Sequence, residues 1–280
     1  MIRETKGTAI AALVLCSALW SSAGILVKLV SWDPFAIAGA RSLIGLITMI
    51  AILGKPRLTF SRDQIIAAVS YSLTMILFIL ANKLTTSANA VFLQYTEPVF
   101  IVILGRWLLT DERTDYLDWI AIAGVLGGMV LFFMDGLSLT ANLGNVLAIA
   151  SGVTFALTAI FMRRQKNVRS QDSFMLAHMI TFAVSIPFMF HAGPPSATGM
   201  VGLALLGVFQ MGLPSVLYGR GMAGVTAISA ALITMIEPVM NPVWVAIFLK
   251  EYPTPRALIG GAVILICVTL RTVFKSAKIH

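Results

Sequence analysis

The sequence has few charged residues. Only 11% of its 280 residues are Asp, Glu, Lys or Arg, whereas 58% are hydrophobic and the mean hydropathy is +0.91. Soluble domains average roughly 25% charged and 45–50% apolar residues, so this composition predicts an integral membrane protein. The 20 cations outnumber the 12 acids, but they are scattered between apolar runs. We therefore expect the lipid bilayer, and no nucleic acid, as a partner.

Cysteine and catalytic motifs are scarce as well. Cys16 and Cys267 lie far apart inside apolar runs, which predicts neither a disulfide framework nor a metal site. The sequence has no HExxH, GxSxG or Walker-type stretch. We expect no enzyme, no cofactor and no metal. An intramembrane enzyme using paired midspan carboxylates is the remote alternative.

Ten apolar segments approach the roughly 20 residues that a helix needs to cross a bilayer. They are predicted at residues 8–30, 34–53, 62–82, 86–109, 116–135, 142–163, 171–191, 197–219, 225–249 and 254–275. Most loop Lys and Arg fall on the side of the N-terminus, and such loops are typically cytoplasmic. The pattern predicts a multi-pass protein of the plasma (bacterial inner) membrane with both termini in the cytoplasm.

The two halves of the chain share an unusual motif. "QYTEPVFIV" and "TMIEPVMNPVW" each place a glutamate and a proline inside an apolar run, half a chain length apart, at Glu97 and Glu237. Splitting the chain into residues 1–135 and 142–280 gives five spans per half, and an odd number predicts opposite insertion. The predicted fold is an all-α integral membrane protein of ten transmembrane helices in two inverted-topology five-helix repeats, with a site at the midplane.

A longer stretch carries a family resemblance. "ANKLTTSANAVFLQYTEPVFIVILGRWLLTDERTDYLDWIAIAGVLGGMVLFF" resembles the EamA-type repeat of the drug/metabolite transporter superfamily, and residues 221–270 form a weaker copy. "DPFAIAGAR", ending at Arg41, is similar to the second span of such proteins. The resemblance implies a central cavity lined by the third, fourth, eighth and ninth helices. It also implies metabolite export, and an exporter of aromatic amino acids is the expected member.

Polar and aromatic residues recur on the helices that this resemblance places around the cavity. Positions three, four and seven apart share a helix face, and a mostly apolar pocket with a few polar groups suits a small amphipathic substrate. Packing alone is the alternative for each side chain. The predicted substrate-binding residues are Trp20, Tyr71, Phe78, Asn82, Lys83, Gln94, Tyr95, Glu97, Gln210, Tyr218, Glu237 and Asn241.

Prolines interrupt several of these helices. A proline lacks the amide donor and loosens a helical turn, so hinges are predicted at Pro98, Pro214, Pro238 and Pro242. The adjacent glutamates either hold the kink or bind a substrate amine or a proton. We expect a monomeric secondary transporter that exports amino acids by alternating access, with efflux of small cationic or lipophilic drugs as the alternative.

Overall fold

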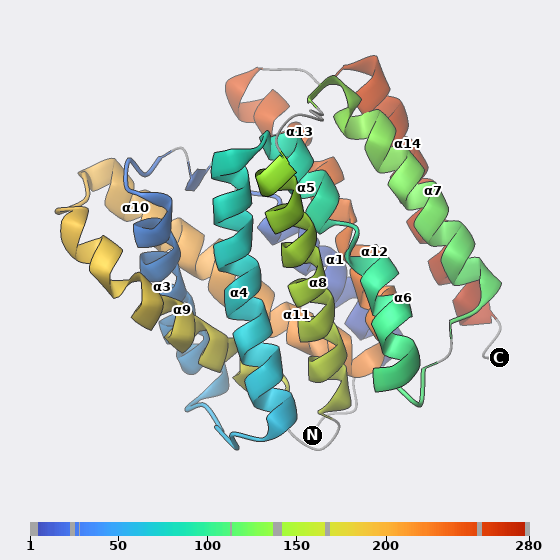
Figure 1. The fold of residues 1–280 in the computed structure, drawn as a ribbon, viewed down its shortest axis with the longest axis horizontal. Coiled ribbons are helices and arrows are strands. Elements are labelled where there is room, and N and C mark those ends of the chain that lie inside the picture. Colours follow the sequence, from blue (N-terminus) through green and yellow to red (C-terminus); the bar gives the residue numbers. More distant parts are fainter. Residues whose placement is uncertain are drawn as a thin grey trace.

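The computed structural model describes residues 5–22, 26–27, 29–112, 114–136, 142–165, 169–250 and 254–277, apart from the side chains of residues 87, 241, 242, 245, 246, 249, 276 and 277. Helices dominate this part of the chain, and it contains no strand (Figure 1). In order, the elements are α1 (Lys6–Trp20), α3 (Pro34–Leu53), α4 (Arg62–Leu84), α5 (Ser87–Gln94), α6 (Glu97–Leu108), α7 (Tyr116–Phe133), η1 (Met134–Gly136), α8 (Asn142–Arg164), α9 (Gln171–His191), α10 (Ala197–Leu205), the π-helical η2 (Leu206–Gly212), α11 (Leu213–Gly224), α12 (Ala227–Thr234), α13 (Ile236–Leu249) and α14 (Pro255–Ala277).

Eight helical segments within the described residues are long and apolar enough to cross a membrane. Six are the single helices α3, α4, α7, α8, α9 and α14, and two are the composite stretches 88–108 and 197–224. Two shorter apolar helices, Lys6–Trp20 and Ala227–Met240, accompany them. The all-α, multi-pass architecture is thereby confirmed, whereas ten crossings stay a prediction.

Local sequence explains where several helices begin. Thr86 precedes α5 and its hydroxyl accepts a hydrogen bond from the amide of Asn89 at 3.1 Å. Thr226 precedes α12 and caps the amide of Ser229 in the same way at 3.3 Å. Such caps satisfy amides that have no partner inside the helix. The corresponding points of the two halves therefore start with the same local chemistry.

Helices from the two halves pack against each other throughout the bundle. The long helix α4 packs on α8 and α9, while α1 packs on α11 and α3 packs on η2. At one edge of the molecule α7 and α14 lie side by side (Figure 1). Glycine permits this last approach, because a Cβ at Gly128 would lie 2.9 Å from the carbonyl oxygen of Gly260. Close packing at small residues is how membrane helices gain contact energy without a hydrophobic driving force.

Candidate functional site

Two apolar helical stretches are interrupted directly before a Glu-Pro pair. The first stretch ends as α5 at Gln94 and restarts as α6 at Glu97. The second ends as α12 at Thr234 and restarts as α13 at Ile236, with Glu237 in its first turn. Proline is tolerated in the first turn of a helix, where no amide donor is needed. Each glutamate thus sits where a new helix starts, deep inside an apolar segment.

The interruptions bring buried Glu97 and half-buried Glu237 into one region of the bundle. The Tyr95 hydroxyl donates a hydrogen bond to Oε2 of Glu237 at 2.5 Å. Glu97 is only 1% exposed, and its Oε1 atom has no hydrogen-bond partner among the described residues. Its carboxyl group lies within electrostatic reach of Glu237. In the described part of the chain no lysine or arginine forms an ion pair with either acid.

An aromatic cluster, defined here as Trp20, Tyr71, Phe155, Phe174 and Tyr218, adjoins the two acids. The Trp20 ring centroid lies 5.5 Å from that of Tyr218 and 6.0 Å from that of Phe155. Tyr71 meets Phe174 edge-on at 4.4 Å. Tyr218 is fully buried, its hydroxyl has no described partner, and it lies within electrostatic reach of Glu97. Ring faces from α1, α4, α8, α9 and α11 therefore border a polar centre with unused hydrogen-bonding capacity.

A second polar group, which is partly buried, lies near Tyr71. Arg41 on α3 donates from Nη1 to Oε1 of Gln210 at 3.1 Å, and its Nε has no described partner. His178 on α9 is hydrogen-bonded to the Ser215 hydroxyl at 3.2 Å. Gln210 belongs to the π-helical segment η2, which precedes Pro214. Because Pro214 has no amide for the carbonyl four residues back, the helix is free to adopt this wider turn.

The predicted substrate residues divide into two groups. Trp20, Tyr71, Tyr95, Glu97, Tyr218 and Glu237 meet around the buried acids, and Gln210 lies with Arg41. Among the prolines, Pro98 and Pro214 occupy first turns of α6 and α11, and Pro238 is buried in α13. The side chains of Asn241 and Pro242 fall outside the described residues.

The other predicted residues contact groups other than the two acids. Phe78 packs with a separate cluster of alanines on α4, α5 and α8, and Asn82 donates to the Phe78 carbonyl at 2.9 Å. Lys83 is 45% exposed in an ion pair with Asp33 at 3.2 Å. The backbone of Gln94 packs closely on α8, because a Cβ atom at Gly152 would lie only 2.6 Å from the Gln94 carbonyl oxygen. Their part in substrate binding stays a prediction.

Sequence reasoning missed Phe155 and Phe174 as members of this region, and it noted Arg41 only in the span that resembles the family. Phe155 had a signal, because the segment that starts there aligns with the segment that starts at Trp20, and the two rings are in contact. Phe174 precedes His178 by one helical turn, so its position on the same face could also have been found. Contact between that face and Tyr71 depends on the angle at which α9 crosses α4. Helix periodicity in the sequence does not predict this angle.

The described architecture is that of a polytopic helical membrane protein. Comparisons with known proteins identify its family. The fold matches that of a protein known from a crystal structure, with a TM-score of 0.84 over 96% of this chain and 99% of that one, at 18% sequence identity. The model of the EamA-like transporter family matches residues 7–134 and again residues 142–273. The chain therefore belongs to the EamA-like transporter family, as the resemblance in its sequence predicted.

Relatives span nearly the whole chain. The sequence is 25% identical over 279 residues to the "Uncharacterized transporter YdfC" of Bacillus subtilis, covering 93% of this chain and 90% of that protein. It is 26% identical over 276 residues to the "Probable terminal-alkyne amino-acid exporter" of Streptantibioticus cattleyicolor, covering 91% and 90%. These names describe transporters, and none of them describes an enzyme.

Proposed function

We propose that this protein is a monomeric secondary transporter that exports amino acids across the bacterial inner membrane by alternating access. The observation that carries the proposal is the pair of buried Glu97 and half-buried Glu237, one acid from each half of the chain. One oxygen of Glu97 has no described partner. The ammonium group of an amino acid would supply both the missing hydrogen-bond donor and the missing positive charge.

The aromatic cluster suits the rest of such a substrate. Aromatic faces attract an ammonium group through their quadrupole, and they also pack against apolar or aromatic side chains. Trp20 and Tyr218 offer these faces directly beside the acids. A relative of similar length is named as a probable amino-acid exporter. The combination favours an amphipathic amino acid, with aromatic ones as the first candidates.

The topology that we propose has ten crossings in two inverted repeats, residues 1–135 and 142–280, with both termini cytoplasmic. Two copies of the family model fall on these two halves. The packing also supports the division, because α4 packs on α8 as its counterpart α11 packs on α1. The two shorter apolar segments, α1 and the stretch Ala227–Met240 that runs from α12 into α13, would then complete the eight longer segments. Loop cations support the orientation.

Alternating access requires one end of the bundle to open. Glu112, after α6, binds Arg163 at the end of α8 and accepts a hydrogen bond from the amide of Ala227 at 2.9 Å. Arg163 also donates to the Met222 carbonyl at 3.2 Å. These contacts join the ends of α6, α8, α11 and α12. We propose that they break when the site opens toward the cytoplasm, while the interruptions beside Pro98 and Pro238 act as hinges.

Efflux of small cationic or lipophilic drugs is the second candidate, because the same acids and rings would bind an organic cation. Uptake by proteoliposomes discriminates the two. We expect saturable uptake of labelled amino acids, reduced at least tenfold by Glu97→Gln and by Trp20→Ala. Lys55→Ala serves as the control, since Lys55 is exposed and is not among the predicted substrate-binding residues.

Uptake of lipophilic cations alone would replace amino-acid export by drug efflux. Full amino-acid uptake by Glu97→Gln would remove the proposed role of the buried acid. We propose separately that transport is coupled to protons through Glu237. This coupling would be abandoned if Glu237→Gln transported amino acids with the same pH dependence as the unaltered protein.

A further inference from the structure

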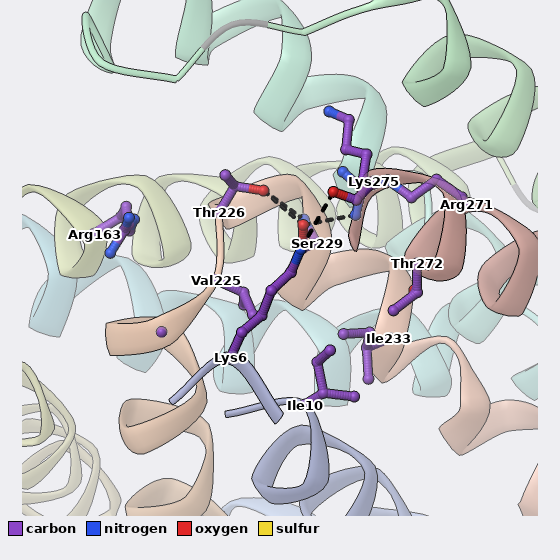
Figure 2. A pocket seen from close by; sticks show the side chains of 11 residues that line it. Lys6, Ile10, Arg163, Val225, Thr226, Ser229, Ile233, Arg271, Thr272 and Lys275 are labelled. Carbon is purple, nitrogen blue, oxygen red and sulfur yellow. Dashed lines mark hydrogen bonds between the residues drawn. The ribbon is translucent and has the colours of Figure 1, made fainter. Parts of the chain in front are cut away.

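A cavity of about 180 Å³ opens where α1 begins and α14 ends (Figure 2). Its charged lining residues are all cations: Lys6, Arg163, Arg271 and Lys275. They come from α1, α8 and α14, while the turn before α12 and α12 itself supply hydroxyl and apolar groups. None of the residues of the buried acid centre lines this cavity, so it has a chemistry of its own.

Carboxylates behind the wall neutralise most of this positive charge. Glu112 binds Arg163, and Asp118 accepts hydrogen bonds from Arg271 at 2.7 Å and from Lys275 at 2.6 Å. Asp115 adds a contact of 3.6 Å to the Lys275 ammonium. These carboxylates do not line the cavity. The opening therefore presents nitrogen donors, whereas the acids that balance them lie behind.

Lys6 is the cation of this lining that forms no ion pair with these acids. Its ammonium group donates to the carbonyl oxygen of Lys275 at 3.3 Å, and within the described residues it has no acidic partner. Arg271 and Lys275 are close enough to repel it. Figure 2 shows Lys6 reaching toward Ser229, whose hydroxyl accepts a hydrogen bond from Arg271 at 2.6 Å. An anion at this point would relieve the repulsion and bond several donors at once.

We propose that this cavity binds a phosphate group that carries one negative charge, supplied by the headgroup of an anionic phospholipid. Among the described residues, the four cations exceed the three nearby carboxylates by one charge, which matches one phosphodiester. Charge-assisted hydrogen bonds from ammonium and guanidinium groups are the strong ones. Basic pockets between membrane helices are known to receive acidic headgroups. The same cavity is also lined by Ile10, Val225 and Ile233, which supply an apolar wall for the adjoining part of a lipid.

A bound phosphate would join the two ends of the chain. Lys6 stands at the start of α1 and Lys275 near the end of α14, and both face the same cavity. The ligand would hold these two helices and α12 together at the membrane surface. This inference does not depend on which substrate the protein transports, and its test measures binding rather than transport.

The test is native mass spectrometry of the purified protein in detergent, titrated separately with phosphatidylglycerol, phosphatidylcholine and inorganic phosphate. We expect one phosphatidylglycerol to bind more tightly than phosphatidylcholine, whose choline offsets the phosphate charge. Lys6→Gln should weaken the phosphatidylglycerol affinity about tenfold, the usual worth of a charged hydrogen bond. The matched control is Lys55→Gln, because Lys55 is exposed and does not line the cavity.

Inorganic phosphate that competes for the same Lys6-dependent site would support the phosphate chemistry and identify a soluble anion as its source. Phosphatidylglycerol binding that depends on Lys6 without such competition would support the lipid. Equal weakening by Lys6→Gln and Lys55→Gln would overturn the proposal, since it would reflect general surface charge. Insensitivity of every probe to Lys6→Gln would overturn it as well.

Discussion

Replacing Asp118 tests how burial determines the contribution of an ion pair to the free energy of unfolding. This side chain is 0% exposed, and it accepts two hydrogen bonds from Arg271, at 3.0 and 2.7 Å, and one from Lys275 at 2.6 Å. The Arg271 side chain is itself only 3% exposed. Asp118→Asn would leave a buried guanidinium without its counter-charge, which costs about 3–5 kcal/mol when one partner of a buried pair is removed.

A matched control joins the same two helical segments. Asp135, directly after α7, pairs with Arg256 on α14 at 3.0 Å, but these side chains are 47% and 64% exposed. Exposed pairs contribute about 0–1 kcal/mol, so Asp135→Asn should change stability little. Reversible unfolding of both variants in mixed micelles measures the difference. Equal loss of stability in the two variants would refute the argument that burial decides the cost.

Three further predictions concern packing, the acid centre and the proposed hinge. Gly128→Ala should cost about 1–3 kcal/mol of unfolding free energy because its Cβ would meet the α14 backbone at 2.9 Å; Gly127→Ala, with nothing within 4 Å, should be neutral or stabilising, and equal melting shifts would contradict this. Tyr95→Phe removes the hydrogen bond to Glu237 and should destabilise by about 1–3 kcal/mol; a double-mutant cycle with Glu237→Gln should show coupling, and strict additivity would count against the contact. Pro98→Ala should slow exchange between states and lower the maximal transport rate in proteoliposomes, whereas an unchanged rate would argue against the hinge.

Sequence patterns predicted most helices because apolar runs and their caps are local features. Residues 34–53 and 171–191 were predicted as spans, and α3 and α9 have those bounds. Asp33 caps α3 at the amide of Phe35, and Pro34 occupies its first turn, so both signals mark the start. Within the first predicted span, 8–30, the described residues are helical up to Trp20 and again at 26–27, with a turn at Ser21 and Ser22.

The candidate site was predictable where the repeat itself carries information. Glu97 and Glu237 lie in matching motifs of the two halves, so the predicted inverted repeat made a close approach possible, and the structure puts them within electrostatic reach. Contacts between helices that are not related by the repeat were not predictable. Lys83 pairs with Asp33 across a loop, and Gln210 receives Arg41 from another helix inside a π-helical turn. These contacts depend on crossing angles and local register, which a single sequence does not specify.

In the proposed mechanism, Glu97 and Glu237 would connect substrate binding to conformational change. An ionised carboxylate inside a membrane costs about 2.5–3.5 kcal/mol on insertion scales, and here Glu97 has an oxygen without a described partner. A ligand can shift a conformational equilibrium only by its difference in affinity between the two states. An ammonium that bonds both acids supplies such a difference, because Glu97 begins α6 and Glu237 lies in the first turn of α13. Movement of one interrupted helix away from the other would separate the two carboxyls, so under this proposal the substrate would stabilise the state that holds them together.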